Sequence, residues 1–147
     1  MFFADRSRAQ LRRVYVEAWR KFSAREPLQP YESQIAAVVA EHREYVPFLE
    51  AEDSAVTAEF PPEAGRENPF LHMSLHLAIR EQVATDRPAG IAQAHRALAA
   101  SLGDAHAAEH AMLSVLGETI WEAQVRGTSP DERAYLERIE RLLRAPR

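Results

Sequence analysis

Cysteine is absent from the 147-residue chain, and this absence removes several kinds of site at once. A disulfide, a thiolate-bound metal, a cysteine-bound iron–sulfur cluster and a cysteine nucleophile all require the thiol group of cysteine. Any metal ion that the chain binds must therefore be held by nitrogen and oxygen atoms.

Glycine is also scarce, with five residues, and long apolar runs are missing. The N-terminal stretch MFFADRSRAQLRR lacks the apolar segment of a signal peptide. No window approaches the roughly 18 apolar residues of a membrane span. These features predict a cytoplasmic protein without a membrane partner. The net charge of −4 argues against a nucleic-acid partner, whereas a small-molecule or anionic ligand and a homo-oligomer are compatible with the composition.

Helical periodicity runs through nearly the whole chain. Apolar residues recur three and four positions apart, and no segment shows the alternation of a strand. We therefore predict an all-α fold, a helical bundle of about six helices with short connections, in a single domain over residues 1–147. Residues 51–67, which contain Pro61, Pro62 and Gly65, are expected to form a loop with at most one helical turn. The expected helices run from an Asp5 or Ser7 cap to Ala24, and over 30–45, 69–85, 89–102, 105–126 and 130–143.

Local signals place several helix ends. Asn68 is expected to cap the third predicted helix, with Pro69 at its first position. Ser129, followed three residues later by Glu132, predicts a capping box for the last helix. The inward stripe expected on the 105–126 helix is His106, His110, Leu113, Gly117, Ile120, Trp121 and Gln124.

Five of the six histidines follow a helical pattern. His72 and His76 stand four apart in NPFLHMSLHLAIREQ, and His106 and His110 stand four apart in LGDAHAAEHAML. His42 closes the apolar run YESQIAAVVAEH. A spacing of four is about one helical turn, so each pair projects two imidazoles from one face. Two imidazole nitrogens on one face are half of a tetrahedral metal site.

The order of the helices predicts that these histidines meet. Short connections make consecutive helices antiparallel, so the third and fifth predicted helices should begin at the same end of the bundle. One histidine pair opens each of those helices, and His42 ends the second helix at the same end. The sequence leaves open whether His95, Glu32 or Glu81 joins them. The predicted metal ligands are His42, His72, His76, His106 and His110.

The predicted function is that of a transition-metal-binding protein with a multi-histidine site, as a one- or two-metal non-haem enzyme or a sensor. Iron and zinc are the first expectation for imidazole and carboxylate ligands, and copper and nickel are alternatives. The string from His106 to His110 matches the HxxEH pattern of inverted zincins, in which the glutamate activates water. Glu109 is therefore the candidate catalytic residue, and a zinc hydrolase is a minor alternative.

A metal-free interpretation is the main alternative. Buried imidazoles can form a hydrogen-bond network in the core, or a cluster that changes charge near neutral pH. The protein would then be an interaction or regulatory module. The metal content of the purified protein distinguishes the metal-binding interpretation from the metal-free one.

The segments NPFLHMSLHLAIREQ, GDAHAAEHAM and ETIWEAQ resemble an uncharacterised bacterial family, domain-of-unknown-function family 1841. The resemblance extends from EAWRKF through ETIWEAQVRGT and implies one small domain without an assigned activity. A looser likeness links the chain to hemerythrin-like and DinB-like helical bundles, which hold metals with histidines. The HxxxE pattern of hemerythrin-like proteins is not matched, because Arg80 stands four residues after His76.

Overall fold

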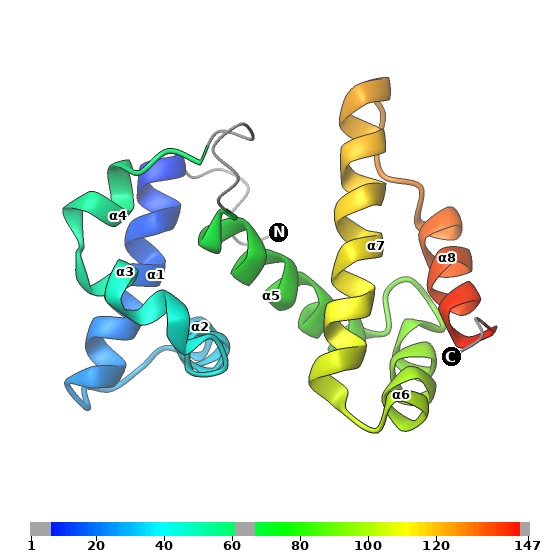
Figure 1. Cartoon of the computed structure of the whole chain (residues 1–147), viewed down its shortest axis with the longest axis horizontal. Coiled ribbons are helices and arrows are strands. Elements are labelled where there is room, and N and C mark those ends of the chain that lie inside the picture. Colours follow the sequence, from blue (N-terminus) through cyan, green and yellow to red (C-terminus); the bar gives the residue numbers. More distant parts are fainter. Residues whose placement is uncertain (1–6, 61–66, 145–147) are drawn as a thin grey trace. The chain divides into compact units, whose positions relative to one another are not determined.

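The computed structural model describes residues 7–60 and 67–144, and all regular structure in these ranges is helical (Figure 1). The expected positions Asp5, Pro61, Pro62 and Gly65 lie outside the described residues. The elements are α1 (Arg8–Ser23), α2 (Pro30–Ala40), the 3₁₀ helix η1 (Arg43–Tyr45), α3 (Val46–Glu50), α4 (Asp53–Thr57), α5 (Pro69–Thr85), α6 (Ile91–Leu102), α7 (Ala105–Arg126) and α8 (Glu132–Arg144). The all-α class is therefore confirmed.

The chain forms two compact units, Met1–Ser74 and Leu75–Arg147. The division falls inside α5, so that the first turns of this helix pack with unit 1 and the rest with unit 2. The single domain and the single bundle expected over residues 1–147 stay predictions.

Unit 1 is built on α1, which begins at a complete capping box. The Ser7 hydroxyl accepts a hydrogen bond from the Gln10 backbone N–H (3.2 Å), and the Gln10 side chain accepts one from the Ser7 N–H (2.9 Å). Helix α1 packs against α2, α3 and α4. The core of unit 1 is made by Tyr15, Ala18, Trp19, Ile35, Ala36, Val38, Val39, Leu49, Ala55, Val56, Phe70 and Met73.

A buried arginine closes the end of α4 in unit 1. Arg12 is 3% exposed, and its guanidinium donates hydrogen bonds to the carbonyl oxygens of Val56 (3.2 Å) and Ala58 (2.6 Å). The same group lies over the Phe70 ring, 4.9 Å from its centroid. Because the last carbonyls of a helix have no intrahelical donor, Arg12 satisfies groups that the short α4 leaves open.

Unit 2 is organised around one apolar cluster. Helix α6 packs against α7, and α8 packs against both. Gly103 and Gly127 end α6 and α7 in the left-handed conformation, with φ of 73° and 65°. Asp104 caps α7 by accepting a hydrogen bond from the His106 backbone N–H (3.1 Å). The buried cluster consists of Ile79, Ile91, Ala94, Leu98, Ala108, Met112, Leu116, Tyr135 and Ile139.

Several predicted helix boundaries need correction. The described residues contain eight α-helices instead of about six, because 46–57 folds into the short helices α3 and α4. The expected 30–45 helix ends at Ala40, because His42 leaves the helical conformation with φ of −130° and ψ of 63°, and the chain continues as η1. The expected 89–102 helix begins at Ile91, after Gly90 in the left-handed conformation.

The cap of the last helix and the face of α7 also differ from expectation. Asp131, not Ser129, caps α8, because the Asp131 side chain accepts a hydrogen bond from the Ala134 N–H (3.0 Å). The buried face of α7 is shifted by one residue from the predicted stripe, and Trp121 is 63% exposed. The residues that α7 buries are Ala108, Glu109, Met112, Leu116, Thr119 and Ala123.

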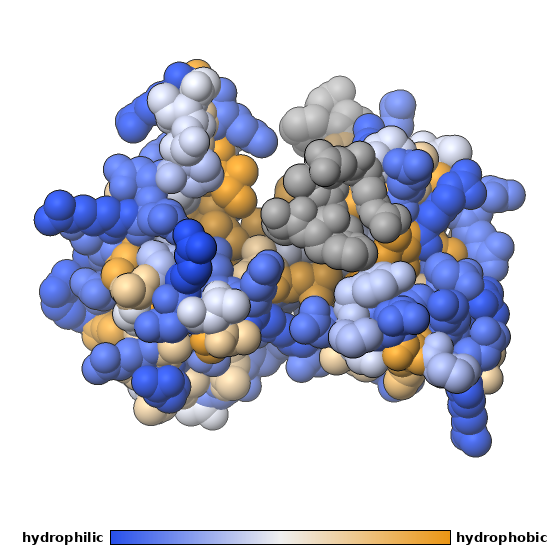
Figure 2. Space-filling view, turned by 180° about the vertical axis from the view of Figure 1, so that it is seen from behind, coloured by the Kyte–Doolittle hydropathy of each residue, from blue (hydrophilic) through white to orange (hydrophobic). Residues whose placement is uncertain are grey.

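No helix in the described part of the chain is long and apolar enough to cross a membrane. Figure 2 shows hydrophilic side chains over most of one face, with apolar side chains scattered between them.

Candidate metal centre

Three histidines of unit 2 come together where α5 and α7 meet. His76 lies on α5, and His106 and His110 lie one turn apart near the start of α7. One ring nitrogen of each histidine lies within 4.8 Å of one ring nitrogen of both others. The ring centroids are 5.4 Å apart for His76 and His106, 4.8 Å for His76 and His110, and 4.4 Å for His106 and His110.

The burial of these three side chains is graded. His76 is fully buried, His106 is half-buried and His110 is exposed. The shifted face of α7 explains this gradient, because it places both α7 histidines beside the core instead of inside it. The group therefore has one ligand anchored in the core and one that faces solvent.

A buried carboxylate orients His76. The Nδ1 atom of His76 is hydrogen-bonded to Oε1 of Glu109, and the side chain of Glu109 is only 10% exposed. A carboxylate accepts hydrogen bonds, so Nδ1 carries the proton and, in a neutral ring, Nε2 has a lone pair. A histidine held in this way by a carboxylate is the usual arrangement of a metal-ligating imidazole.

Glu109 is itself held by Arg80, which lies one turn after His76 on α5. The Arg80 Nε donates to both carboxylate oxygens, at 3.0 and 3.2 Å. Burial raises the pKa of Glu109, but the hydrogen bond with His76 and the charge of Arg80 outweigh burial, so that the pKa lies below its usual value. Glu109 is therefore a carboxylate that faces both a histidine and an arginine.

Unit 1 contains a second histidine contact, between His42 and His72. His42 follows the end of α2 and is 3% exposed, and its Nδ1 bonds to the backbone carbonyl of Val38 (2.7 Å). His72 lies on the first turn of α5, and its Nδ1 bonds to Oε1 of Glu67 (2.7 Å). The two Nε2 atoms are 3.2 Å apart.

The partners of the two Nδ1 atoms determine what lies between the two rings. A carbonyl and a carboxylate can only accept, so both Nδ1 atoms carry a proton and, in neutral rings, both Nε2 atoms carry a lone pair. Two lone pairs that face each other at 3.2 Å repel, unless a proton or a metal cation lies between them. Two nitrogens bound to one tetrahedral zinc ion lie about 3.3–3.4 Å apart, from metal–nitrogen bonds of about 2.0–2.1 Å. The observed separation suits either occupant.

Comparison with known families identifies the chain. The model of the family described as Domain of unknown function (DUF1841) matches residues 7–141. The chain belongs to this family. No curated protein and no solved structure matches it. The suspected resemblance is therefore confirmed over nearly the whole chain, and the candidate centre is defined by the geometry of this DUF1841 protein alone.

The DUF1841 chain thus brings together three of the five predicted ligands in unit 2, and the remaining two in unit 1. The convergence of all five on a common point stays a prediction. His95 lies on α6 and is not part of the histidine group, and Glu81 is exposed. Glu32 is bonded to Lys21 (3.0 Å) and to the backbone N–H of Gln29 (2.8 Å).

Two residues that orient the site were missed in the sequence. Arg80 stands four positions after His76, so that helical spacing alone places both on one face of α5. That spacing is the sequence signal for Arg80, and a comparison with the HxxxE pattern alone does not use it. Glu67 lies outside α5, because Asn68 caps this helix by accepting a hydrogen bond from the Phe70 N–H (3.0 Å). Helical periodicity does not extend to a residue before the cap, so it gives no signal for Glu67.

Proposed function

We propose that this DUF1841 protein binds a transition metal through histidines, and that His76, His106 and His110 hold one ion. The observation that carries the proposal is the close grouping of three ring nitrogens, one of them on a buried imidazole oriented by Glu109. Burying the polar side chains of His76 and Glu109 costs desolvation free energy. If the Nε2 atom of His76 binds a metal, the buried pair has a function that accounts for this cost.

The donor set suits the expected metals. Three imidazoles fit zinc and iron first, with copper and nickel as competitors. Three protein ligands leave a coordination position for water, a small anion or a substrate. A metal in such a position supplies Lewis acidity or an activated water. The exposure of His110 gives that position a route to solvent.

Glu109 takes the role of a positioning residue in this proposal. Its carboxylate oxygens accept hydrogen bonds from His76 and Arg80. A carboxylate bonded in this way is suited to orienting an imidazole and less suited to taking a proton from water. The zinc-hydrolase alternative requires Glu109 as the base. We therefore favour a metal-binding protein over that hydrolase.

His42 and His72 form a second proposed ligand pair, because both Nε2 atoms present lone pairs at 3.2 Å. The same contact also supports the metal-free alternative, in which a shared proton joins the two rings and makes the pair respond to pH. Metal and proton compete for the same two lone pairs, so an experiment can tell them apart.

The first test is elemental analysis of protein purified without a histidine tag, followed by thermal unfolding with and without a chelator. We expect at least one zinc or iron ion per chain, and a melting temperature that falls when the ion is removed. A protein without metal, whose unfolding is identical in zinc and in chelator, would refute the proposal. The pH-responsive alternative is then supported if unfolding changes steeply near neutral pH.

A matched pair of variants assigns the site. Replacing His76 with alanine should lower zinc affinity by more than about 100-fold, beyond the 10–100-fold typical of losing a residue that only orients a ligand. Replacing His95 with alanine, on the neighbouring α6, should leave zinc affinity unchanged. Equal losses in both variants would show that His76, His106 and His110 do not form the site.

An open coordination position has its own test. Cobalt(II) can replace zinc and gives a visible spectrum that depends on its ligands. Azide or phosphate added to the cobalt-loaded protein should change that spectrum in a saturable way if the ion has a free position. An unchanged spectrum would indicate a closed, structural site.

A further inference from the structure

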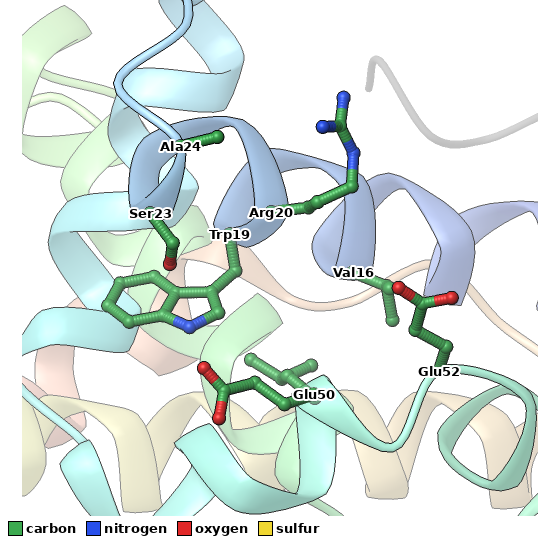
Figure 3. A pocket seen from close by; sticks show the side chains of 8 residues that line it. Val16, Trp19, Arg20, Ser23, Ala24, Glu50 and Glu52 are labelled. Atoms are coloured by element: carbon green, nitrogen blue, oxygen red, sulfur yellow. The ribbon is translucent and has the colours of Figure 1, made fainter.

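A pocket in unit 1, separate from the histidines, has the size and lining of a small-molecule site. Its volume is about 400 Å³, within the range of about 300–1,000 Å³ common for ligand pockets. The indole of Trp19 and the side chains of Val16 and Leu49 line its apolar part, and Ser23, Glu50 and Glu52 line its polar part (Figure 3).

The Trp19 indole carries an unsatisfied donor at this pocket. Trp19 is 8% exposed, and its Nε1–H is a buried polar group without a hydrogen-bond partner in the described residues. Leaving such a donor unpaired costs roughly 1–3 kcal/mol. The nitrogen side of the indole faces the carboxylate of Glu50 in Figure 3. A ligand in the pocket can therefore supply the acceptor that the protein does not.

The charge of the lining selects the kind of ligand. Arg20 is the one cation that lines the pocket, and its guanidinium is paired with Glu17 (2.6 Å) and Glu26 (2.8 Å). Glu50 and Glu52 are exposed carboxylates at the same opening. The lining therefore carries an excess of negative charge, which favours a cationic ligand.

We propose that this pocket binds a small organic ammonium compound that also carries an acceptor oxygen. The ammonium group lies at Glu50 and Glu52, the oxygen accepts from the Trp19 Nε1–H, and an apolar body contacts Trp19, Val16 and Leu49. Each part of the ligand answers one feature of the lining: the two carboxylates, the unpaired indole N–H and the apolar side chains.

The probe is leucinamide, which has an ammonium group, a carbonyl oxygen and an isobutyl body. The chain has two tryptophans, so its indole N–H groups give two NMR signals, and Trp121→Phe assigns the signal of Trp19. We expect leucinamide to move the Trp19 signal downfield with a millimolar Kd, as a new hydrogen bond requires. The Trp121 signal should stay in place, because Trp121 lies on α7 of unit 2.

Matched compounds and variants separate the contributions. N-acetylleucinamide lacks the positive charge and isopentylamine lacks the carbonyl, so each should bind at least several-fold more weakly than leucinamide. Glu50→Gln should weaken leucinamide binding about 3–10-fold, from the loss of one exposed charge pair. The response of the Trp19 signal to leucinamide should be the same with and without a metal chelator, which keeps this test independent of metal binding by leucinamide.

Two results would overturn the proposal. One is a Trp19 signal that does not respond to leucinamide, or that responds equally to N-acetylleucinamide. The other is an upfield shift of the Trp19 signal in ligand-free Glu50→Ala protein, which would show that Glu50 already accepts from the indole.

Discussion

The two units orient a histidine in the same way but in different surroundings. In unit 2, His76 bonds through Nδ1 to Glu109, which is 10% exposed and held by Arg80. In unit 1, His72 bonds through Nδ1 to Glu67, which is 63% exposed. The chemical arrangement is the same, yet water competes for Glu67 and hardly reaches Glu109. The comparison teaches that burial, and not the type of contact, decides how strongly a carboxylate holds an imidazole.

The units also end their longest helices differently. Gly127 follows α7 and Arg25 follows α1, and both adopt the left-handed conformation, with φ of 65° and 58°. Glycine has no Cβ to clash in this conformation, whereas arginine does. Arg25 therefore stores strain after the end of α1, whereas Gly127 avoids it at the end of α7.

Among changes that leave every histidine in place, the largest effect is expected from replacing Glu109 with glutamine, which removes the charge but keeps the shape. Zinc affinity of the intact protein should fall about 10–100-fold, because His76 loses the carboxylate that sets its tautomer. The metal-free protein should lose roughly 1–3 kcal/mol in its free energy of unfolding, since Arg80 keeps a partner without charge. Glu118→Gln, an exposed change on the same helix, is the control, and equal effects of both variants would contradict the special role of Glu109.

The contribution of Glu109 should depend on pH in a defined direction. Its pKa is lower in the folded protein than the ordinary value of 4.5. The stabilisation is therefore complete above about pH 4.5 and is lost as the pH falls through the folded pKa. The difference in unfolding free energy between the metal-free protein and its Glu109→Gln variant should shrink as the pH falls below about 4.5. A difference that grows on acidification would contradict this sign.

Exchanging the two helix ends sharpens the second comparison. Gly127→Ala should destabilise the protein by about 1 kcal/mol or more, because a Cβ there is strained although nothing lies within 4 Å of it. Arg25→Gly should stabilise it by up to about 1 kcal/mol for the opposite reason. Denaturant unfolding measures both, and changes of the same sign would show that the backbone conformation does not control them.

The smallest effect is expected from Glu67→Gln. An exposed carboxylate is screened by water, so the loss of its contact with His72 should change zinc affinity less than about 3-fold and stability by less than about 1 kcal/mol. Isothermal titration of zinc into the Glu67→Gln and Glu109→Gln variants measures the loss of affinity in each and so compares the two losses. A loss as large as that of Glu109→Gln would mean that burial does not separate the two units.

The fold was predictable where local chemistry is strong. Asp104 and Gly127 bound α7 where expected, and Ser7 begins α1 with its capping box. The face of α7 was not predictable in the same way, because Met112 and Leu116 form one apolar stripe and Leu113 and Ile120 form the neighbouring one. Periodicity does not choose between two adjacent stripes. Packing against α6 and α8 makes that choice.

The site was predictable as far as helical spacing extends. The four-residue spacing of His106 and His110 places them together, and their 4.4 Å separation confirms it. The hydrogen-bond partners of the Nδ1 atoms were not predictable in this way. The partner of His42 is the backbone carbonyl of Val38, and every residue has such a carbonyl, so the sequence carries no signal for it. The HxxEH string marks Glu109 as chemically important, but the pairing of Glu109 with Arg80 joins two helices and has no local sequence pattern.

The ion pair between Arg80 and Glu109 has a consequence for the charge of the proposed centre. Neutral imidazoles add no charge, and the positive charge of Arg80 offsets the negative charge of the Glu109 carboxylate beside His76. A divalent ion bound there would keep nearly its whole double positive charge, as the largest local charge in the site. Such a centre draws its fourth ligand from solution and prefers an anion, whereas a carboxylate-rich centre would repel one. In the proposed centre, Arg80 would thereby favour an anion as the additional ligand of the metal.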